Sequence, residues 1–159
     1  MQLLGLNYRI TDLQAALGSS QLKRLPSFIE KRRELAQVYV EAFKENSLIR
    51  VPAGDSELVR HAYHLFPIQI SFEKISLSRN ELFSFLRENS IGVQVHYIPV
   101  CWHPFYQRNQ KLWLSVSIPE AESFYEKTVS IPMFSSLSLS DCRRISQVIN
   151  EACVDSAEK

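Results

Sequence analysis

The stretch GLNYRITDLQAALGSSQL, residues 5–22, determines how the chain is organised. It opens with a polar turn and passes directly into an amphipathic pattern, with no strand before it. Ile10, Leu13 and Leu17 recur at helical spacing, and Thr11 or Asp12 is suited to begin a helix. The pattern predicts a helix over residues 10–23, only a few residues after the first methionine.

Composition limits the classes of protein to consider. A chain of 159 residues with 45% hydrophobic and 22% charged residues is typical of one globular domain. Its 18 basic and 17 acidic residues are interspersed, which argues against a nucleic-acid-binding face. No apolar run approaches the roughly 20 residues of a membrane span. The start lacks the features of a secretory signal, and three cysteines are few, so we expect a reduced, cytoplasmic protein.

Downstream of the first helix, the spacing of apolar residues predicts a small α+β domain. Pro26 is expected to end the first helix, and a second helix is predicted over residues 27–46, with the charge run at 30–34 facing water. The buried stripe of this second helix is predicted to contain Phe28, Leu35, Val38, Tyr39, Ala42 and Phe43.

The rest of the chain alternates between short strands and helices. Strands are predicted at 48–51, 62–71, 91–99 and 129–132, helices at 78–89, 117–128 and 138–153, and a helical turn at 103–107. Ser78 and Glu81 form a capping box, and Pro67 indicates an edge strand or a bulge. We therefore expect a small, mostly antiparallel sheet covered by helices, preceded by a long linking helix.

Ordered motifs along nearly the whole chain resemble one enzyme family. The first combines Gly5, Asn7 and Arg9 with Gln14-Ala15-Ala16 and Gln21-Leu22. It is followed by AYHLFPIQI (62–70), GVQVHYIPV (92–100), HPFY (103–106), AESFYEKTVSIPMF (121–134) and LSLSDCRRISQVI (137–149). The set resembles the DegT/DnrJ/EryC1/StrS sugar aminotransferases, pyridoxal-phosphate enzymes of the aspartate-aminotransferase fold. VQVHYIPV is most similar to the transaminases that aminate UDP-linked 4-keto-6-deoxy sugars on the pseudaminic acid route.

This resemblance implies that the chain corresponds to the C-terminal portion of such an enzyme. Residues 1–25 would be the motif turn and interdomain helix, 26–153 the small domain, and 154–159 a frayed tail. None of the seven lysines stands in the S-x-H-x-x-K context of the family's cofactor lysine. We therefore expect no catalytic residue here and no turnover by the chain alone, because transamination needs that amine.

The resemblance also assigns roles to four residues. Asn7 would donate its amide to the pyridoxal-phosphate phosphate of a neighbouring subunit, although an asparagine here also suits a turn. Arg9 would contact a substrate carboxylate or phosphate, or anchor the turn to its own domain. His96 and Tyr97 would approach the nucleotide-sugar pocket; the alternative is a core tyrosine beside a hydrogen-bonded histidine. Many relatives carry a histidine at the position of Cys101.

Partners and alternatives follow from the same comparison. The resemblance implies that the parent enzyme takes a UDP-sugar and an amino-acid donor, glutamate, and that it is a homodimer or docks a separate N-terminal half. Neither Cys101 with His103 nor the histidines as a set has the spacing of a nucleophilic or zinc site, so no metal is expected. The other hypothesis is a non-catalytic interaction domain, or remnant, that retains the family's dimer surface.

Overall fold

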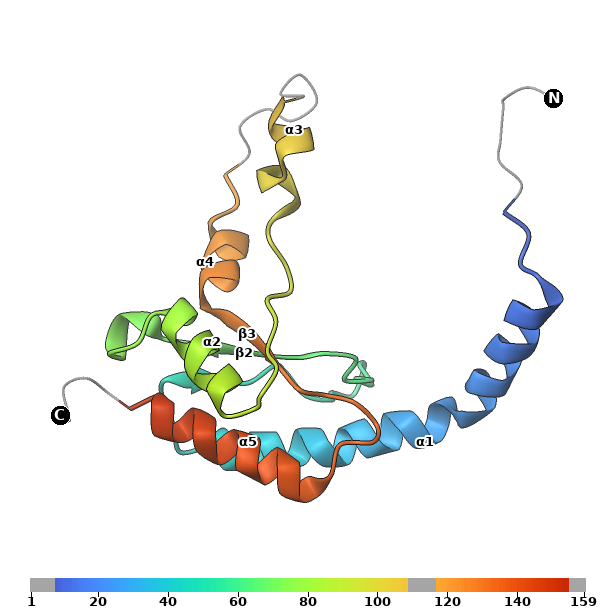
Figure 1. Cartoon of the computed structure of the whole chain (residues 1–159), viewed down its shortest axis with the longest axis horizontal. Helices are drawn as coiled ribbons and strands as arrows, with labels where there is room; N and C mark the ends of the chain where they lie inside the picture. The colour runs from blue at the N-terminus through green and yellow to red at the C-terminus, as the bar shows by residue number, and fades with distance from the viewer. Residues whose placement is uncertain (1–7, 109–116, 155–159) are drawn as a thin grey trace.

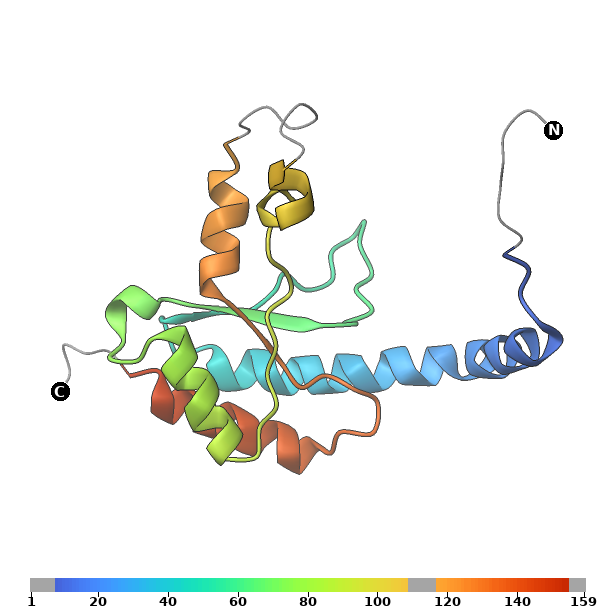
Figure 2. The same cartoon turned by 45° about the horizontal axis from the view of Figure 1, so that its top comes forward.

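The fold is a three-stranded antiparallel sheet with helices on both sides. The computed structural model describes residues 8–108 and 117–154. The sheet has the order β1 (Ile49–Arg50), β2 (Phe66–Ile70) and β3 (Thr128–Ile131). The helices α1 (Asp12–Phe43), α2 (Arg79–Glu88) and α5 (Leu139–Ala152) lie on one side, and the short helices α3 (Pro104–Arg108) and α4 (Pro119–Lys127) project from the other (Figure 2). The predicted α+β class is confirmed.

The two faces of the sheet differ because side chains alternate along each strand. Phe66 pairs with Ile131, Ile68 with Val129, and Ile70 with Ile49. All six are buried, and they form the face that packs on α1 and α5. The opposite face carries Gln69, Thr128 and Ser130.

The second half of α1 forms the base of the hydrophobic core. Leu35, Tyr39 and Phe43 are buried as predicted, and Ala36 is buried in addition. The predicted Phe28, Val38 and Ala42 are only partly buried. The Tyr39 ring lies 5.0 Å from that of Phe66 between centroids, and its hydroxyl donates to the carbonyl of Pro132 at 2.8 Å. This one side chain therefore joins α1, the sheet and the loop after β3.

The predicted helix break at Pro26 is wrong. Helix α1 begins at a capping box formed by Thr11 and Gln14 and continues through Pro26 to Phe43. Figure 1 shows its axis changing direction within the first half of the helix. A proline inside a helix removes one hydrogen bond and bends the axis, and the packing of the following half on α5 keeps the chain helical.

Two strand predictions also need correction. The expected strand 62–71 is reduced to Phe66–Ile70, and Tyr63 before it has a positive φ of 46°. Pro67 lies in the central strand, but β1 pairs only with residues 69 and 70 and ends before it comes opposite this proline. The expected strand 91–99 makes a single bridge, Gln94 to Ser130, at the free edge of β3.

The remaining predicted elements are present with small shifts. Helix α2 has the predicted Ser78–Glu81 capping box, and α3 is the helical turn expected at 103–107. Pro119 opens α4, although Ile118 rather than Ser117 is its N-cap. Helix α5 buries the predicted Cys142, Ile145 and Ile149, followed by Cys153 at its C-cap.

The first half of α1 has a different environment from the second. Ile10, Leu13, Leu17 and Leu22 are all exposed, and within the described residues no element covers them. The apolar side predicted from the sequence is therefore a surface of this chain.

The two halves of α1 should respond differently to the same substitution. Leu35→Ala removes a fully buried side chain and should lower the free energy of unfolding by about 2–5 kcal/mol. Leu13→Ala, at a position that is 82% exposed, should change it by less than about 0.5 kcal/mol. Urea unfolding followed by circular dichroism measures both, and equal losses would contradict the assigned core.

The cysteines should react in a fixed order. Burial raises the pKa of Cys142 to about 11 and that of Cys153 to about 12, so both thiols stay protonated near neutral pH. Cys101 is only half-buried. Iodoacetamide at pH 8, read by mass spectrometry, should modify Cys101 first and the other two only after denaturation. Early modification of Cys142 or Cys153 in the folded Cys101→Ser variant would contradict their burial.

Candidate functional site

The face of the sheet opposite α1 and α5 carries a group of polar side chains. Gln94 is paired with Ser130 at the edge of β3, and His96 follows two residues later, just beyond this isolated bridge. Together with Gln69 and Thr128 these residues form what we call the polar face. The segment that carries His96 and Tyr97 leaves the sheet from this side and leads to α3 (Figure 1).

His96 and Tyr97 have unequal surroundings. The ring centroids lie 4.5 Å apart in an edge-on arrangement, across a cis peptide bond. His96 is half-buried, and its Nδ1 is enclosed without a hydrogen-bond partner, whereas Nε2 is not enclosed. Tyr97 is 68% exposed. Tyr97 is therefore not a core residue in this chain, and both side chains present polar atoms outward.

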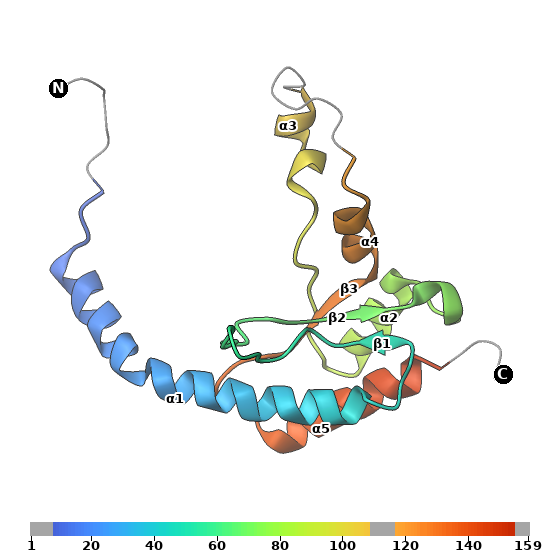
Figure 3. The ribbon, with the colours of Figure 1, turned by 180° about the vertical axis from the view of Figure 1, so that it is seen from behind.

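The other two predicted site residues do not join this pair. Arg9 is exposed and makes no ion pair or hydrogen bond with the described residues, neither to a ligand group nor to its own domain. The segment before α1, which contains Arg9, is remote from the segment that leads to α3 in all three views (Figures 1–3). Asn7 lies outside the described residues. The described chain brings together only part of the predicted set.

Cys101 and His103 lie in the turn that follows. Cys101 belongs to a short 3-10 helix, Val100–Trp102, and His103 is exposed beside it. Among residues 8–108 and 117–154, no three His, Cys, Asp or Glu side chains come close enough to hold a metal ion. The arrangement gives no support to a nucleophilic or metal site here.

Two arginines with clear structural roles were not identified from the sequence. Arg33 lies in the charge run that was predicted to face water, but its guanidinium pairs with Asp55 at 2.8 Å and donates to the carbonyl of His61. Arg79 lies over the Tyr125 ring and donates to the Tyr125 carbonyl, tying α2 to α4. Their partners lie 22 and 46 residues away in the sequence, so no local sequence pattern indicates these contacts.

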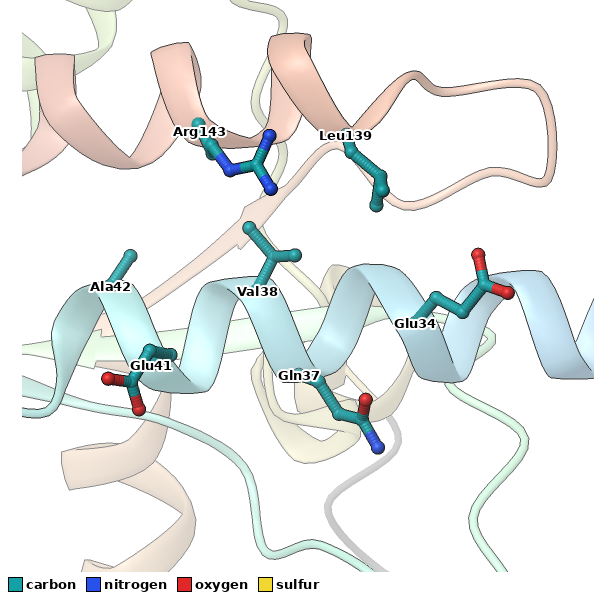
Figure 4. Close-up of a pocket in the computed structure, with 7 residues that line it drawn as sticks. All are labelled: Glu34, Gln37, Val38, Glu41, Ala42, Leu139 and Arg143. Carbon is teal, nitrogen blue, oxygen red and sulfur yellow. The ribbon is translucent and has the colours of Figure 1, made fainter.

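Four cavities of the described chain are lined by neither His96 nor Tyr97. Figure 4 shows one of about 560 Å³ between α1 and α5, where Val38 and Ala42 face Leu139 and Arg143. Three others, of about 340, 350 and 430 Å³, lie beside His61, Asn46 and Phe134. No lysine lines any of these four.

The lysines of the described chain do not fit a Schiff base with pyridoxal phosphate. Such a lysine needs an enclosed, water-poor pocket that also holds the phosphate. Lys31, Lys44 and Lys127 instead pair at the surface with Glu34, Glu41 and Glu73. Lys23 and Lys74 are exposed. None of these five described lysines has the enclosure that a Schiff base needs.

Comparison with known proteins gives a consistent result. Residues 1–150 match the model of the DegT/DnrJ/EryC1/StrS aminotransferase family. The chain is 35% identical over 149 residues to the UDP-4-amino-4,6-dideoxy-N-acetyl-beta-L-altrosamine transaminase of Campylobacter jejuni, covering 92% of this chain and 38% of that protein. It is also 35% identical to the spore coat polysaccharide biosynthesis protein SpsC of Bacillus subtilis, with the same coverage. The chain thus spans about two-fifths of the length of these curated relatives.

Solved structures give the same fold. Helicobacter pylori PseC, an aminotransferase involved in pseudoaminic acid biosynthesis, superposes with a TM-score of 0.82 at 28% identity, over 96% of this chain and 40% of that one. Streptomyces DesV (S. venezuelae) superposes with a TM-score of 0.80 at 27% identity, over 94% and 38%. No helix in the described ranges is long and apolar enough to cross a membrane. The chain belongs to the DegT/DnrJ/EryC1/StrS aminotransferase family.

Proposed function

We propose that this chain is the C-terminal, substrate-contacting part of a pyridoxal-phosphate-dependent nucleotide-sugar aminotransferase. The observation that carries the proposal is the family match over residues 1–150, combined with coverage of only 38% of the altrosamine transaminase. The parent reaction would move an amino group, from a donor such as glutamate, to the 4-keto carbon of a UDP-linked 6-deoxy sugar. The chain alone would be inactive.

The geometry supports a binding role rather than a covalent one. Pyridoxal phosphate, when bound, supplies the electron sink for amino transfer, and its lysine is not found among the described residues. What the chain offers is the exposed Tyr97 hydroxyl and the unenclosed Nε2 of His96. Both groups can hydrogen-bond to a sugar hydroxyl or diphosphate oxygen and so orient the keto carbon.

The first half of α1 supports a division of the chain into two parts. Its exposed leucines would pack on the remaining part of the enzyme, with residues 1–25 as the connecting segment and 26–153 as the small domain. Residues 8–11, before α1, lie on the same side of the sheet as α3 and α4 (Figure 2). In this arrangement Asn7 and Arg9 would reach the cofactor phosphate or substrate in a homodimer.

The exposed apolar side of α1 also suits the other hypothesis, a non-catalytic domain that retains the family's dimer surface. The two functions differ in what the chain does when the rest of an enzyme is supplied. An interaction domain would associate without restoring amino transfer.

The isolated chain should not form a covalent adduct with pyridoxal phosphate. Mixing the two at neutral pH should give no absorbance band of a lysine-bound cofactor, and borohydride reduction should leave no single modified lysine by peptide mapping. Full-length Helicobacter pylori PseC provides the positive control. One stoichiometric adduct on the isolated chain would contradict the proposed inactivity.

A chimera should restore activity and test His96 directly. The corresponding C-terminal part of the Campylobacter jejuni transaminase is replaced by this chain, and amino transfer from glutamate to its UDP-keto sugar is measured. His96→Gln should raise KM about three- to tenfold, the effect of losing one hydrogen bond, with a smaller change in kcat. His64→Gln, at an exposed site before β2, is the matched control. A folded, dimeric chimera without activity would favour the interaction domain.

A further inference from the structure

The polar face contains an unusual concentration of enclosed polar atoms. Among the described residues, four side-chain nitrogen or oxygen atoms are enclosed without a partner: Arg32 Nε, His96 Nδ1, Thr128 Oγ1 and Ser130 Oγ. Three of the four belong to the polar face. Thr128 is 0% exposed and Ser130 is 4% exposed, so their hydroxyls have no access to bulk water. Such groups are normally paired, because an unpaired buried hydroxyl is destabilising.

The bridge between Gln94 and Ser130 brings the segment that carries His96 to the edge of β3, the strand that holds both hydroxyl residues. Gln94 and Ser130 exchange both backbone hydrogen bonds, at 3.1 and 2.8 Å, so their side chains share a face. The bridge is isolated, so His96 is not paired with Thr128, but the antiparallel direction carries the chain after Gln94 toward the Thr128 end of β3.

The chemistry of the three groups is complementary. Each hydroxyl can donate one hydrogen bond, and Nδ1 of a neutral imidazole accepts one when the ring proton is on Nε2. A hydroxyl that donates to Nδ1, directly or through one water molecule, stabilises this tautomer and fixes the ring plane.

We propose that Thr128, assisted by Ser130, is a positioning residue for His96. Its hydroxyl donates, through one enclosed water molecule, to Nδ1 and keeps the proton on Nε2, so that His96 presents an N–H donor at the surface of the polar face. The acceptor for that N–H, a phosphate or sugar oxygen, rests on the function proposed above. The tautomer and orientation of the free ring do not, because the groups that set them all lie within this chain.

Residue type at position 128 supports a polar role. Valine has nearly the same shape as threonine and would satisfy the strand and the burial equally well, as Val129 does on the other face. A threonine with a truly unpartnered hydroxyl would be less stable than that valine. The hydroxyl is accounted for if it is bonded to His96 through this water molecule.

The experiment measures the tautomer of His96 in the full chain without any ligand. Long-range ¹⁵N–¹H spectra of histidine-labelled protein, with the signal assigned by His96→Gln, should show the Nε2–H tautomer. Thr128→Val should shift the signal toward a mixture of tautomers and lower Tm, whereas Thr128→Ser should retain both the tautomer and most of the Tm. Ser130→Ala should give a smaller shift in the same direction. The exposed His103 serves as an internal reference that none of these variants changes.

Two results would overturn the inference. One is an Nδ1–H tautomer in the unsubstituted chain, since Nδ1 would then not accept from Thr128. The other is an unchanged His96 signal in folded Thr128→Val, with Tm equal or higher, as expected for a hydroxyl that is merely unpaired. If instead the tautomer behaves as proposed while the active chimera is insensitive to His96→Gln, the positioning role stands and the substrate role of His96 fails.

Discussion

The contact of Tyr39 with the sheet is the constraint on which the rest of this domain depends. Its ring packs on Phe66 of the central strand, and its hydroxyl binds the carbonyl of Pro132, directly after β3. Burial raises the pKa of this phenol, so it remains a donor throughout the neutral range. The contact fixes the distance between α1 and the sheet, and it directs the chain after β3 back beneath the sheet to begin α5.

The hydrophobic core covers one side of the sheet, so the polar side chains of the strands lie on the other side. The strands alternate between core residues and the polar face, and the segment with His96 and Tyr97 rises from the edge of that face. Side chains held on a rigid sheet keep their geometry better than those on a free loop. The core thus determines where the segment that carries His96 leaves the sheet.

Much of this arrangement could be predicted from local pattern. Helical spacing placed α5 and the second half of α1, and the Ser78–Glu81 pair placed the start of α2, because these signals act within a few residues. The predictions at Pro26 and Pro67 failed for different reasons. Packing on α5 keeps α1 helical through Pro26, and β1 ends before it comes opposite Pro67. The proposed roles of His96 and Tyr97 come from family motifs, whereas Arg33 contacts residues that are distant in sequence.

The bend at Pro26 turns the first half of α1 into a lever arm. Residues 12–25 extend about 21 Å at the helical rise per residue. A change of about 10° in the bend would therefore move the far end by about 4 Å, more than the length of a hydrogen bond. The position of Arg9 therefore depends on Pro26, a residue that is not in contact with it. Substitutions around residue 26 would change the position of the N-terminal motif relative to the sheet without changing the sequence of the motif.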